Sequence, residues 1–328
     1  MTLQIVIFAI GLVLVIKGGD LFVSSSVRIA EFLKMPHVVI GSTLVSLATT
    51  SPELVVSIMS GVKGESGLAL GNAVGSCVCN IALILGLMAT MKHIRLHPKT
   101  LAVPLTAMCV AGVLLLLMTL NLKITRVQGL SLIALGVGYF IYDFRRCMKD
   151  DTPSDVEEAT QIEEVIVSGH RWLDKPWGTA VQFLFGAVVV VCGSGMLVEA
   201  AVNIATSLGV PTIVIGLSIV AVGTSLPELV TAISSSRQNV SDLAVGNVLG
   251  ANVANLTLIV GSAASIQEMS MSRVTQLFNF PALLLLMALV AFFILRCKGI
   301  TRKQGVWLLG CYVLYVAGLV ILTVLKKA

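Results

Sequence analysis

Long apolar runs separated by short polar stretches extend along almost the whole chain. A helix needs about 20 predominantly apolar residues to cross the hydrocarbon core of a bilayer. Because that core offers the backbone no other hydrogen-bond partners, such a segment crosses it as a helix. The pattern predicts ten transmembrane helices, at residues 2–27, 38–61, 67–90, 101–120, 127–144, 178–199, 211–235, 243–266, 274–295 and 304–325.

The composition agrees with this prediction. Hydrophobic residues make up 56% of the 328 residues and charged residues 12%, whereas soluble domains contain about 25% charged residues. The predicted spans leave almost nothing for a soluble domain. We therefore expect an all-α integral membrane protein whose surroundings are the lipid bilayer, with no nucleic-acid partner. We also expect it to function as a monomer.

Basic residues are distributed unequally between the predicted loops. If the N-terminus lies outside the cell, 15 Lys and Arg residues fall on the inner side and 6 on the outer side. Because cytoplasmic loops carry the excess of basic residues, we expect a multi-pass protein of the cell membrane with both termini outside. The linker at 145–177 is then cytosolic. The seven acidic residues at 150–164 lack the spacing of a calcium-binding loop, so we interpret the linker as a flexible tether.

Two segments of the chain repeat each other. Residues 41–86 align with residues 216–261 at a constant offset of 175, and 20 of the 46 positions are identical. The identities concentrate in Gly, Pro, Asn and Glu, which shared hydrophobicity does not explain. The second copy begins five spans after the first and therefore crosses the membrane in the opposite direction. This predicts two inverted five-helix repeats, 1–144 and 178–328, an arrangement typical of secondary transporters.

Each copy places a proline and a glutamate near the centre of a span, in the motifs TTSPE and TSLPE. An ionised carboxylate at that depth costs roughly 2.5–3.5 kcal/mol or more unless it is paired, so Glu53 and Glu228 indicate a functional site. Proline breaks the helix and leaves carbonyl groups near residues 47–48 and 222–223 without their usual partners. With the nearby hydroxyl groups they form an all-oxygen environment that suits a hard cation such as Na⁺ or Ca²⁺. These hydroxyl groups belong to Thr49, Thr50, Ser51, Thr224 and Ser225.

A second pair of motifs, GNAVGSCVCN and GNVLGANVAN, places Asn80 and Asn255 near the centres of the third and eighth spans. In each motif two glycines lie four residues apart, a spacing that lets helices approach closely. We expect the third span to contact the second, and the eighth to contact the seventh. Asn80 would then approach Glu53, and Asn255 would approach Glu228.

Other polar residues in apolar stretches indicate no further site. Asp20 lies three residues from Lys17, which favours a local ion pair. We interpret Cys77 and Cys79 as small buried hydrophobic side chains. The sequence contains no His-Glu-x-x-His motif, and no nucleophile–base arrangement stands out. We therefore expect a protein that is not an enzyme and has no cofactor.

The repeated segments resemble the sodium/calcium exchanger family of the calcium/cation antiporter superfamily. The resemblance is carried by GSTLVSLATTSPELVVSIMSG and GNAVGSCVCNIALILG in the alpha-1 motif (41–86), and by GLSIVAVGTSLPELVTAIS and GNVLGANVANLTLIVG in the alpha-2 motif (216–261). It implies ten helices, with spans two, three, seven and eight forming a core around the ions and spans one and six forming a gate that slides across that core. Carried over position by position, it implies ion ligands at Glu53, Glu228, Asn80, Asn255, Thr49, Thr50, Ser76, Thr224, Ser225, Ser46 and Ala221.

The chain departs from the family pattern at two positions. Many members have Asp where this chain has Asn255, and Ser where it has Ala251. The core then keeps two carboxylates, which neutralise one Ca²⁺ or two Na⁺ ions. A further Na⁺ would leave an uncompensated charge in a low dielectric. We therefore expect weaker Na⁺ binding, or a different stoichiometry, than in a relative with Asp.

These observations predict a secondary active antiporter that exchanges Ca²⁺ for Na⁺ across the cell membrane by alternating access. One alternative is an antiporter of Ca²⁺ or another cation against H⁺, with Glu53 and Glu228 as the proton sites. A cation channel is a second alternative. Channels usually build their filter on a symmetric subunit axis, whereas this chain carries its own repeat.

Overall fold

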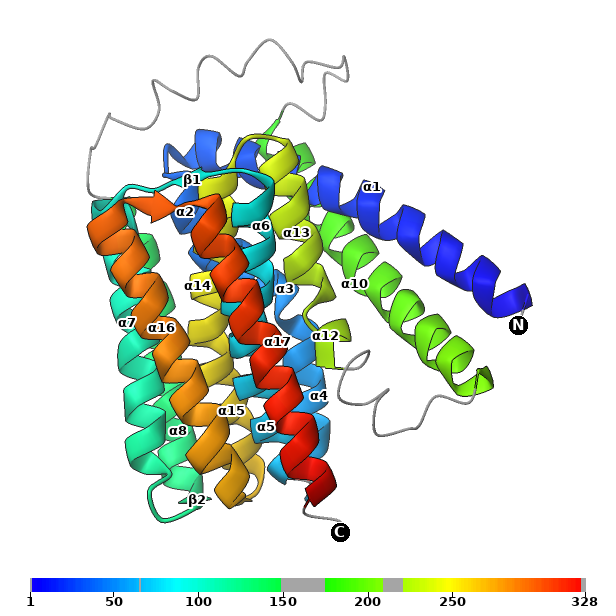
Figure 1. The fold of residues 1–328 in the computed structure, drawn as a ribbon. Helices are drawn as coiled ribbons and strands as arrows, with labels where there is room; N and C mark the ends of the chain where they lie inside the picture. Colours follow the sequence, from blue (N-terminus) through cyan, green and yellow to red (C-terminus); the bar gives the residue numbers. More distant parts are fainter. Residues whose placement is uncertain (1, 65, 149–174, 209–220, 326–328) are drawn as a thin grey trace.

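The computed structural model describes residues 2–64, 66–148, 175–208 and 221–325, and this part of the chain is almost entirely helical (Figure 1). The elements of the first half are α1 (Thr2–Leu33), α2 (His37–Ile40), α3 (Ser46–Thr49), α4 (Ser51–Val62), α5 (Ser66–Val78), α6 (Gly86–Met91), β1 (Ile94–Arg95), α7 (Pro98–Met118), β2 (Lys123–Ile124) and α8 (Arg126–Cys147). Those of the second half are α10 (Pro176–Ser207), α12 (Ala221–Gly223), α13 (Leu226–Arg237), α14 (Ser241–Ala254), α15 (Val260–Ile266), β3 (Met269–Ser270), α16 (Phe280–Cys297), β4 (Gly299–Ile300) and α17 (Arg302–Leu325). π-Helical turns continue several of these helices, at Gly41–Val45, Cys79–Leu85, Asn255–Ile259 and Thr275–Asn279.

Most of the predicted spans are present as apolar helices. Within the described residues, eight helices are long and apolar enough to cross a membrane. The helices His37–Thr49 and Ser51–Val62, bent by 46° relative to each other, form a ninth candidate. Residues 211–220, the first part of the expected seventh span, lie outside the described residues, as does the linker from 149 to 174. The all-helical membrane fold is thus confirmed, while the count of ten spans stays a prediction.

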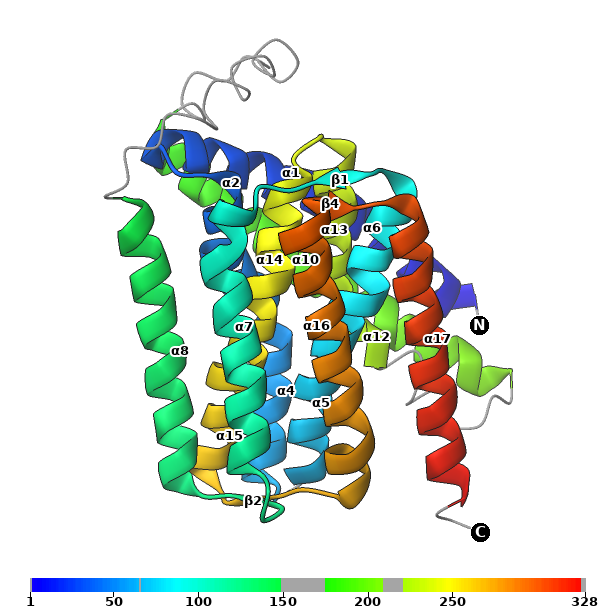
Figure 2. The same ribbon diagram turned by 60° about the vertical axis from the view of Figure 1, so that its left-hand side comes forward.

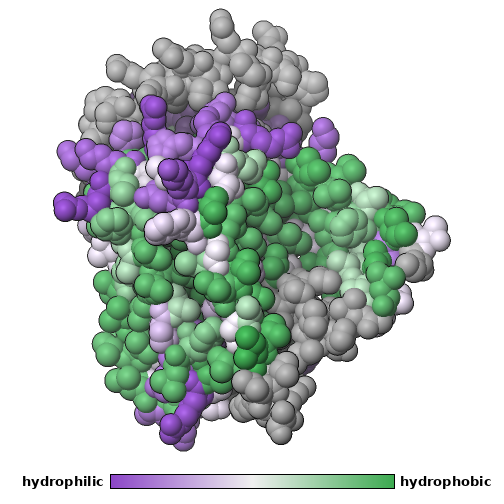
Figure 3. Space-filling model, viewed as in Figure 1, coloured by the Kyte–Doolittle hydropathy of each residue, from purple (hydrophilic) through white to green (hydrophobic). Residues whose placement is uncertain are grey.

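The surface of the molecule has the distribution of polarity that a bilayer requires. Figure 3 shows apolar residues covering the middle of the visible face, with hydrophilic residues concentrated at the end that carries β1 and a smaller group at the opposite end. Large exposed hydrophobic side chains on α7, α16 and α17 include Val110, Leu117, Phe292 and Leu314. Their exposure is compatible with contact to lipid tails instead of water.

Two helices are longer than the sequence predicted. α1 and α10 each contain 32 residues and extend past the predicted ends at residues 27 and 199. At 1.5 Å per residue each is about 48 Å long, which exceeds the roughly 30 Å hydrocarbon core. The two helices lie side by side and are steeply inclined to the other helices (Figure 1). Inclination of this kind keeps a long apolar helix within the bilayer.

The two spans with the repeated Gly-Asn motifs form the centre of the bundle. In the most apolar windows of Ser241–Ile266 and Ala69–Met91, 94% and 72% of the residues are buried. The corresponding share in the other six long helices is 17–44%. Polar residues carried by these two spans are therefore shielded from lipid and can face only other helices.

The glycine pair of the eighth span contacts a different helix from the expected one. A Cβ atom at Gly246 would collide with the carbonyl group of Val38, and one at Gly250 with that of Ser42. α14 therefore packs closely against α2 and the π-helical turn that follows it, in the other half of the chain. The expected contact between the eighth and seventh spans is present, as α14 beside α13, but these glycines make their closest approach to the second span. Glycine spacing indicates a close approach but not the partner helix.

The expected contact between the third and second spans is present, but the glycines do not make it. α5 lies beside α4, and the Asn72 side chain of α5 donates a hydrogen bond to the Ser57 hydroxyl of α4, at 3.2 Å. In the described part of the chain, no atom of another helix lies within 4 Å of a Cβ placed at Gly71 or Gly75. Polar side chains join these two helices instead.

Short antiparallel strand pairs join the two halves of the chain at opposite ends of the bundle (Figures 1 and 2). β1 pairs with β4, and β2 pairs with β3. In the first pair Ile94 lies opposite Ile300, and in the second Ile124 lies opposite Met269. Each half thus contributes one strand at each end, which ties the outer helices of the two halves together.

Candidate cation-binding site

Both glutamates lie where a helix is interrupted. α3 ends at Thr49 and α4 begins at Ser51, with the intervening Thr50 outside helical geometry. α12 ends at Gly223 and α13 begins at Leu226, with Ser225 likewise outside helical geometry. A proline occupies the first turn of α4 and of α13, where its missing N–H removes no intrahelical hydrogen bond. The predicted breaks are confirmed at both places.

The breaks place each carboxylate at the start of a half-helix. Glu53 lies in the first turn of α4 and Glu228 in the first turn of α13. The backbone N–H groups there carry a partial positive charge, which favours an anion. Both side chains have no exposed surface, and they are close enough to each other to interact electrostatically. The two half-helices therefore direct their positive ends at one buried pair of acids.

Hydroxyl groups from the two breaks cross between the halves. Ser225 donates a hydrogen bond to Oε1 of Glu53, at 3.4 Å. Thr49 lies beside the carboxyl group of Glu228, although its hydroxyl donates to Oδ1 of Asn247, at 3.2 Å. These contacts join residues separated by more than 150 positions, so both breaks belong to one site.

A matching pair of contacts connects Thr224 to Asn72. The Thr224 hydroxyl donates to Oδ1 of Asn72, at 3.4 Å, and the Asn72 amide donates to the backbone oxygen of Glu53, also at 3.4 Å. Thr49 and Asn247 form the equivalent bond in the other half. Each member of one pair lies 175 positions from a member of the other. The repeated residues therefore make reciprocal contacts.

Several buried polar atoms of the predicted ion ligands have no hydrogen-bond partner among the described residues. A buried polar atom without a partner usually costs about 1–3 kcal/mol, so unpartnered oxygens on two neighbouring carboxylates indicate a ligand. Neither glutamate forms an ion pair with a basic residue in the described part of the chain. The unpartnered atoms are Oε2 of Glu53, both carboxylate oxygens of Glu228, Oγ of Ser76, Oδ1 of Asn80, and both side-chain polar atoms of Asn255.

Some of the predicted hydroxyls form local bonds instead. Thr50 donates to the Ser46 carbonyl, at 2.7 Å, and Ser51 donates to the Ala48 carbonyl, at 2.8 Å. The Ala48 carbonyl, which Pro52 leaves without its usual partner, is therefore satisfied by Ser51. The Ser46 carbonyl also accepts from the backbone N–H of Thr50, at 3.0 Å, and lies 3.4 Å from the Thr49 hydroxyl. Its two lone pairs are therefore occupied within the break, and a cation would have to displace one of these donors. Ala221, the other expected carbonyl ligand, begins α12.

Sequence reasoning missed two side chains beside this site. Cys79 is buried next to Ser225 and to Tyr312 of α17, within electrostatic range of both glutamates. Its position directly before Asn80 in the repeated motif was a usable signal. For Tyr312 the sequence offered none, because α17 lies outside the two aligned segments, 41–86 and 216–261.

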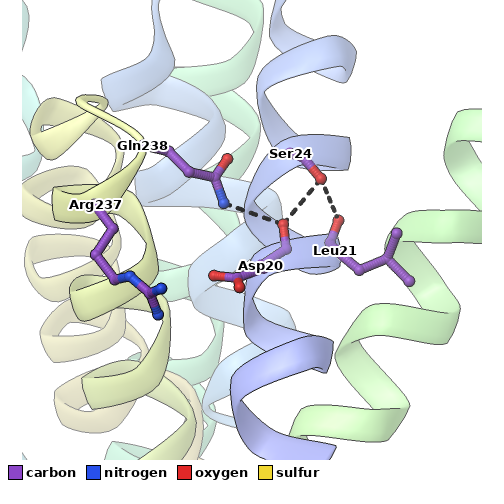
Figure 4. A pocket seen from close by; sticks show the side chains of 5 residues that line it. All are labelled: Asp20, Leu21, Ser24, Arg237 and Gln238. Atoms are coloured by element: carbon purple, nitrogen blue, oxygen red, sulfur yellow. Dashed lines mark hydrogen bonds between the residues drawn. The ribbon is translucent and has the colours of Figure 1, made fainter. Parts of the chain in front are cut away.

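A pocket of about 470 Å³ lies between the inclined helix α1 and the end of α13 (Figure 4). It is lined by Asp20, Leu21, Ser24, Arg237 and Gln238. The Asp20 carboxylate accepts a hydrogen bond from Ser234, at 2.9 Å, and its backbone oxygen accepts one from Gln238, at 3.1 Å. The ion pair expected between Asp20 and Lys17 is absent from the described residues, because Asp20 faces α13.

The chain matches a family model and full-length relatives over almost all of its length. Residues 3–144 and 178–321 match the family model described as sodium/calcium exchanger protein. The sodium/calcium exchanger MaX1 of Methanosarcina acetivorans is 30% identical over 341 residues, which covers 96% of this chain and 97% of that protein. The inner membrane protein YrbG of Escherichia coli is 29% identical over 324 residues, which covers 97% of each chain.

A solved structure agrees with the fold. The structure of the sodium-calcium exchanger NCX_Mj, soaked with zero Na⁺ and Ca²⁺, matches this chain with a TM-score of 0.82 and 27% sequence identity. The match covers 97% of this chain and 99% of that chain.

Proposed function

The chain belongs to the sodium/calcium exchanger protein family, and from this premise we propose that it exchanges Ca²⁺ for Na⁺ across the cell membrane by alternating access. The observation that carries the proposal is the pair Glu53 and Glu228, buried together at two half-helix starts with oxygen atoms left unpartnered. Carboxylate, hydroxyl and amide oxygens are the ligands that Ca²⁺ and Na⁺ prefer.

The proposed ion ligands come from both interrupted spans and from the two central spans. The carboxylates neutralise the ions, the hydroxyl and amide oxygens replace their hydration shells, and two backbone carbonyls complete the set. We assign these roles to Glu53, Glu228, Asn80, Asn255, Thr49, Thr50, Ser76, Thr224, Ser225, Ser46 and Ala221.

Charge neutralisation makes the exchange obligatory. Without ions, the two carboxylates at the centre of the bundle would oppose passage through a closed, dry state, since charge is costly there. One Ca²⁺ or two Na⁺ ions cancel them. Both ions use overlapping oxygen ligands, so they compete, and only loaded forms change sides.

The arrangement we propose for transport is ten helices in two inverted five-helix repeats, working as a monomer. The reciprocal Thr–Asn bonds support it, as do the strand pairs at opposite ends. We further propose that both termini lie outside, that the linker at 145–177 is cytosolic, and that α1 and α10 slide as a gate across the core. Their steep inclination and the Asp20 pocket between α1 and α13 support the last point.

Calcium uptake into proteoliposomes tests this function. Vesicles loaded with Na⁺ should take up Ca²⁺ when diluted into Na⁺-free buffer, while a pH gradient without Na⁺ should drive no uptake. Uptake driven by the pH gradient alone would instead support a Ca²⁺/H⁺ antiporter. Flux far above carrier rates under an applied voltage would support a channel. A current that corresponds to three Na⁺ per Ca²⁺ would contradict the stoichiometry expected from two carboxylates.

A further inference from the structure

The two central asparagines, Asn80 and Asn255, differ in their surroundings although they occupy equivalent positions of the repeat. The side-chain amide of Asn80 donates to Oδ1 of Asn252, at 3.0 Å. Asn255 has no hydrogen-bond partner for either end of its amide among the described residues. One amide is thus held in place, and the other is not.

A third residue, Met108, decides which of the two asparagines donates in the hydrogen bond between Asn80 and Asn252. The amide nitrogen of Asn252 lies 3.4 Å from the sulfur atom of Met108, on α7. A thioether sulfur has lone pairs but no hydrogen, so it can only accept. The NH₂ group of Asn252 must therefore face Met108, which turns its oxygen toward Asn80.

This fixes the orientation of Asn80 as well. Because Oδ1 of Asn252 can only accept a hydrogen bond, Asn80 must direct its NH₂ group toward it. Oδ1 of Asn80 therefore faces away from Asn252. That oxygen is buried and has no donor among the described residues. An amide has nearly the same shape at both ends, so only its hydrogen bonds decide which end faces a given site. All three side chains are buried, with at most 1% exposure, so water does not replace these bonds.

The other half of the molecule lacks this chain of hydrogen bonds. The residue 175 positions before Asn252 is Cys77, and the residue 175 positions after Met108 is Leu283. Neither a thiol nor a leucine can hold an amide in one orientation as Asn252 and Met108 do. Cys77 instead lies against the backbone oxygen of Asn252, with its sulfur atom at 3.8 Å.

We propose that Asn252, anchored by Met108, is a positioning residue that fixes Asn80 with its oxygen available to the transported cation. Asn255 is not fixed in this way, so the two amides contribute unequally to Ca²⁺ binding. The inference rests on the proposed exchange function and on Asn80 as an ion ligand. It adds an asymmetry, set by Asn252 and Met108, to a site whose other residues repeat.

A double-mutant cycle on Ca²⁺ uptake tests the inference. Asn252→Leu should raise the KM for Ca²⁺ about fivefold, the loss expected when one hydrogen bond between neutral groups is removed, with the maximal rate nearly unchanged. Asn80→Ala should raise the KM by a similar factor. If Asn252 acts only through Asn80, adding Asn252→Leu to Asn80→Ala should raise the KM no further. Effects that multiply would overturn the positioning role.

Matched variants separate orientation from packing. Met108→Leu keeps the volume but removes the acceptor, and should raise the KM about threefold. The mirror changes Cys77→Ala and Leu283→Met should leave the KM unaltered. A larger effect from the mirror changes than from Met108→Leu would also overturn the inference.

The same measurements distinguish this inference from the proposed function. If the unmodified protein shows no Na⁺-driven uptake, the proposed function is wrong, and the cycle is then measured as direct ⁴⁵Ca²⁺ binding to the purified protein. If the unmodified protein exchanges and Asn80→Ala lowers Ca²⁺ affinity, but Asn252→Leu does not, only the positioning role is wrong. Thermal unfolding in detergent identifies variants that fail to fold. For those, Met108→Leu in the same cycle decides the outcome.

Discussion

Two buried carboxylate sites in this protein are built in opposite ways. Asp143 of α8 has 2% exposure, and its Oδ2 atom accepts hydrogen bonds from Ser42, at 2.7 Å, and from Tyr139, at 3.3 Å. Arg146 lies within electrostatic range of it. Glu53 and Glu228 share a site with no basic residue paired to them among the described residues, and three of their four carboxylate oxygens lack a donor.

The difference shows what a structural acid looks like in this fold. Where a carboxylate only joins helices, the chain supplies hydroxyl donors and a nearby cationic side chain. A fully satisfied acid gains nothing from an ion, whereas an unsatisfied pair binds one strongly. The missing donors at Glu53 and Glu228 are therefore the structural feature that most supports the proposed transport site.

The largest expected effect comes from removing the charge of the unsatisfied pair. Glu53→Gln and Glu228→Gln should each lower Na⁺-driven Ca²⁺ uptake at least about a hundredfold, because a neutral amide cannot offset the ion's charge in low dielectric. Both variants should fold, since Gln keeps the shape of Glu. Uptake in proteoliposomes and thermal unfolding in detergent measure the two properties. Intact exchange in both variants would reject the site.

The satisfied acid should show the opposite behaviour. Asp143→Ala removes the acceptor of Ser42 and Tyr139 and should lower the free energy of unfolding by about 2 kcal/mol, while the KM for Ca²⁺ stays unchanged. Asp143→Asn is the matched control, because its remaining oxygen can still accept, and should lose less stability. Chemical denaturation in detergent, together with uptake assays, compares these variants. A large rise in KM for Asp143→Asn would place this acid in the transport pathway. Asp143 would then not differ in role from Glu53 and Glu228.

A third acid at the site should sharpen the comparison further. Asn255→Asp restores the residue found in many family members and adds one negative charge, so it should lower the Na⁺ concentration for half-maximal exchange about fivefold. The charge moved per Ca²⁺ should also rise, because a further Na⁺ is then neutralised. Solid-supported membrane currents and tracer flux together measure the ratio. An unchanged ratio and unchanged Na⁺ dependence would contradict the charge argument.

The smallest effect is expected at the contact between α1, which we propose to be part of a gate, and α13 of the core. Ser234→Ala removes the hydroxyl that donates to Asp20. It should change the equilibrium constant between the two proposed positions of α1 about fivefold, the effect of one ordinary hydrogen bond. The maximal exchange rate should change while the KM at the buried site changes little. Ser236→Ala on the same helix is the control, since Ser236 makes no bond to Asp20. Equal rates for both variants would show that the Asp20 contact does not influence the gate.

The repeat made much of the site predictable. The acids, prolines and hydroxyls at the two breaks could be located because they recur at one offset, and a broken helix follows locally from proline. The hydrogen-bond network of Asn252 and Met108 escaped the same reasoning. A search for repeated residues favours identical pairs, whereas Asn252 is informative because its counterpart is Cys77.

Glycine spacing shows the same limit. It correctly indicated that α14 approaches another helix closely, yet the partner is α2 and the turn after it, across the two halves. The inclination of α1 and α10 could not be predicted either, because hydropathy records the length of an apolar run but not its angle.

The sequence by itself determined the helical membrane fold, the positions of the helix breaks and the presence of an acid near the centre of each broken span. Each of these depends on neighbouring residues and on the thickness of a bilayer. Only the tertiary structure decided which hydroxyl meets which carboxylate and which amide is held in one orientation. Those contacts join side chains such as Ser225 and Glu53, 172 positions apart. Their pairing is set by how the two halves pack, which no local pattern records.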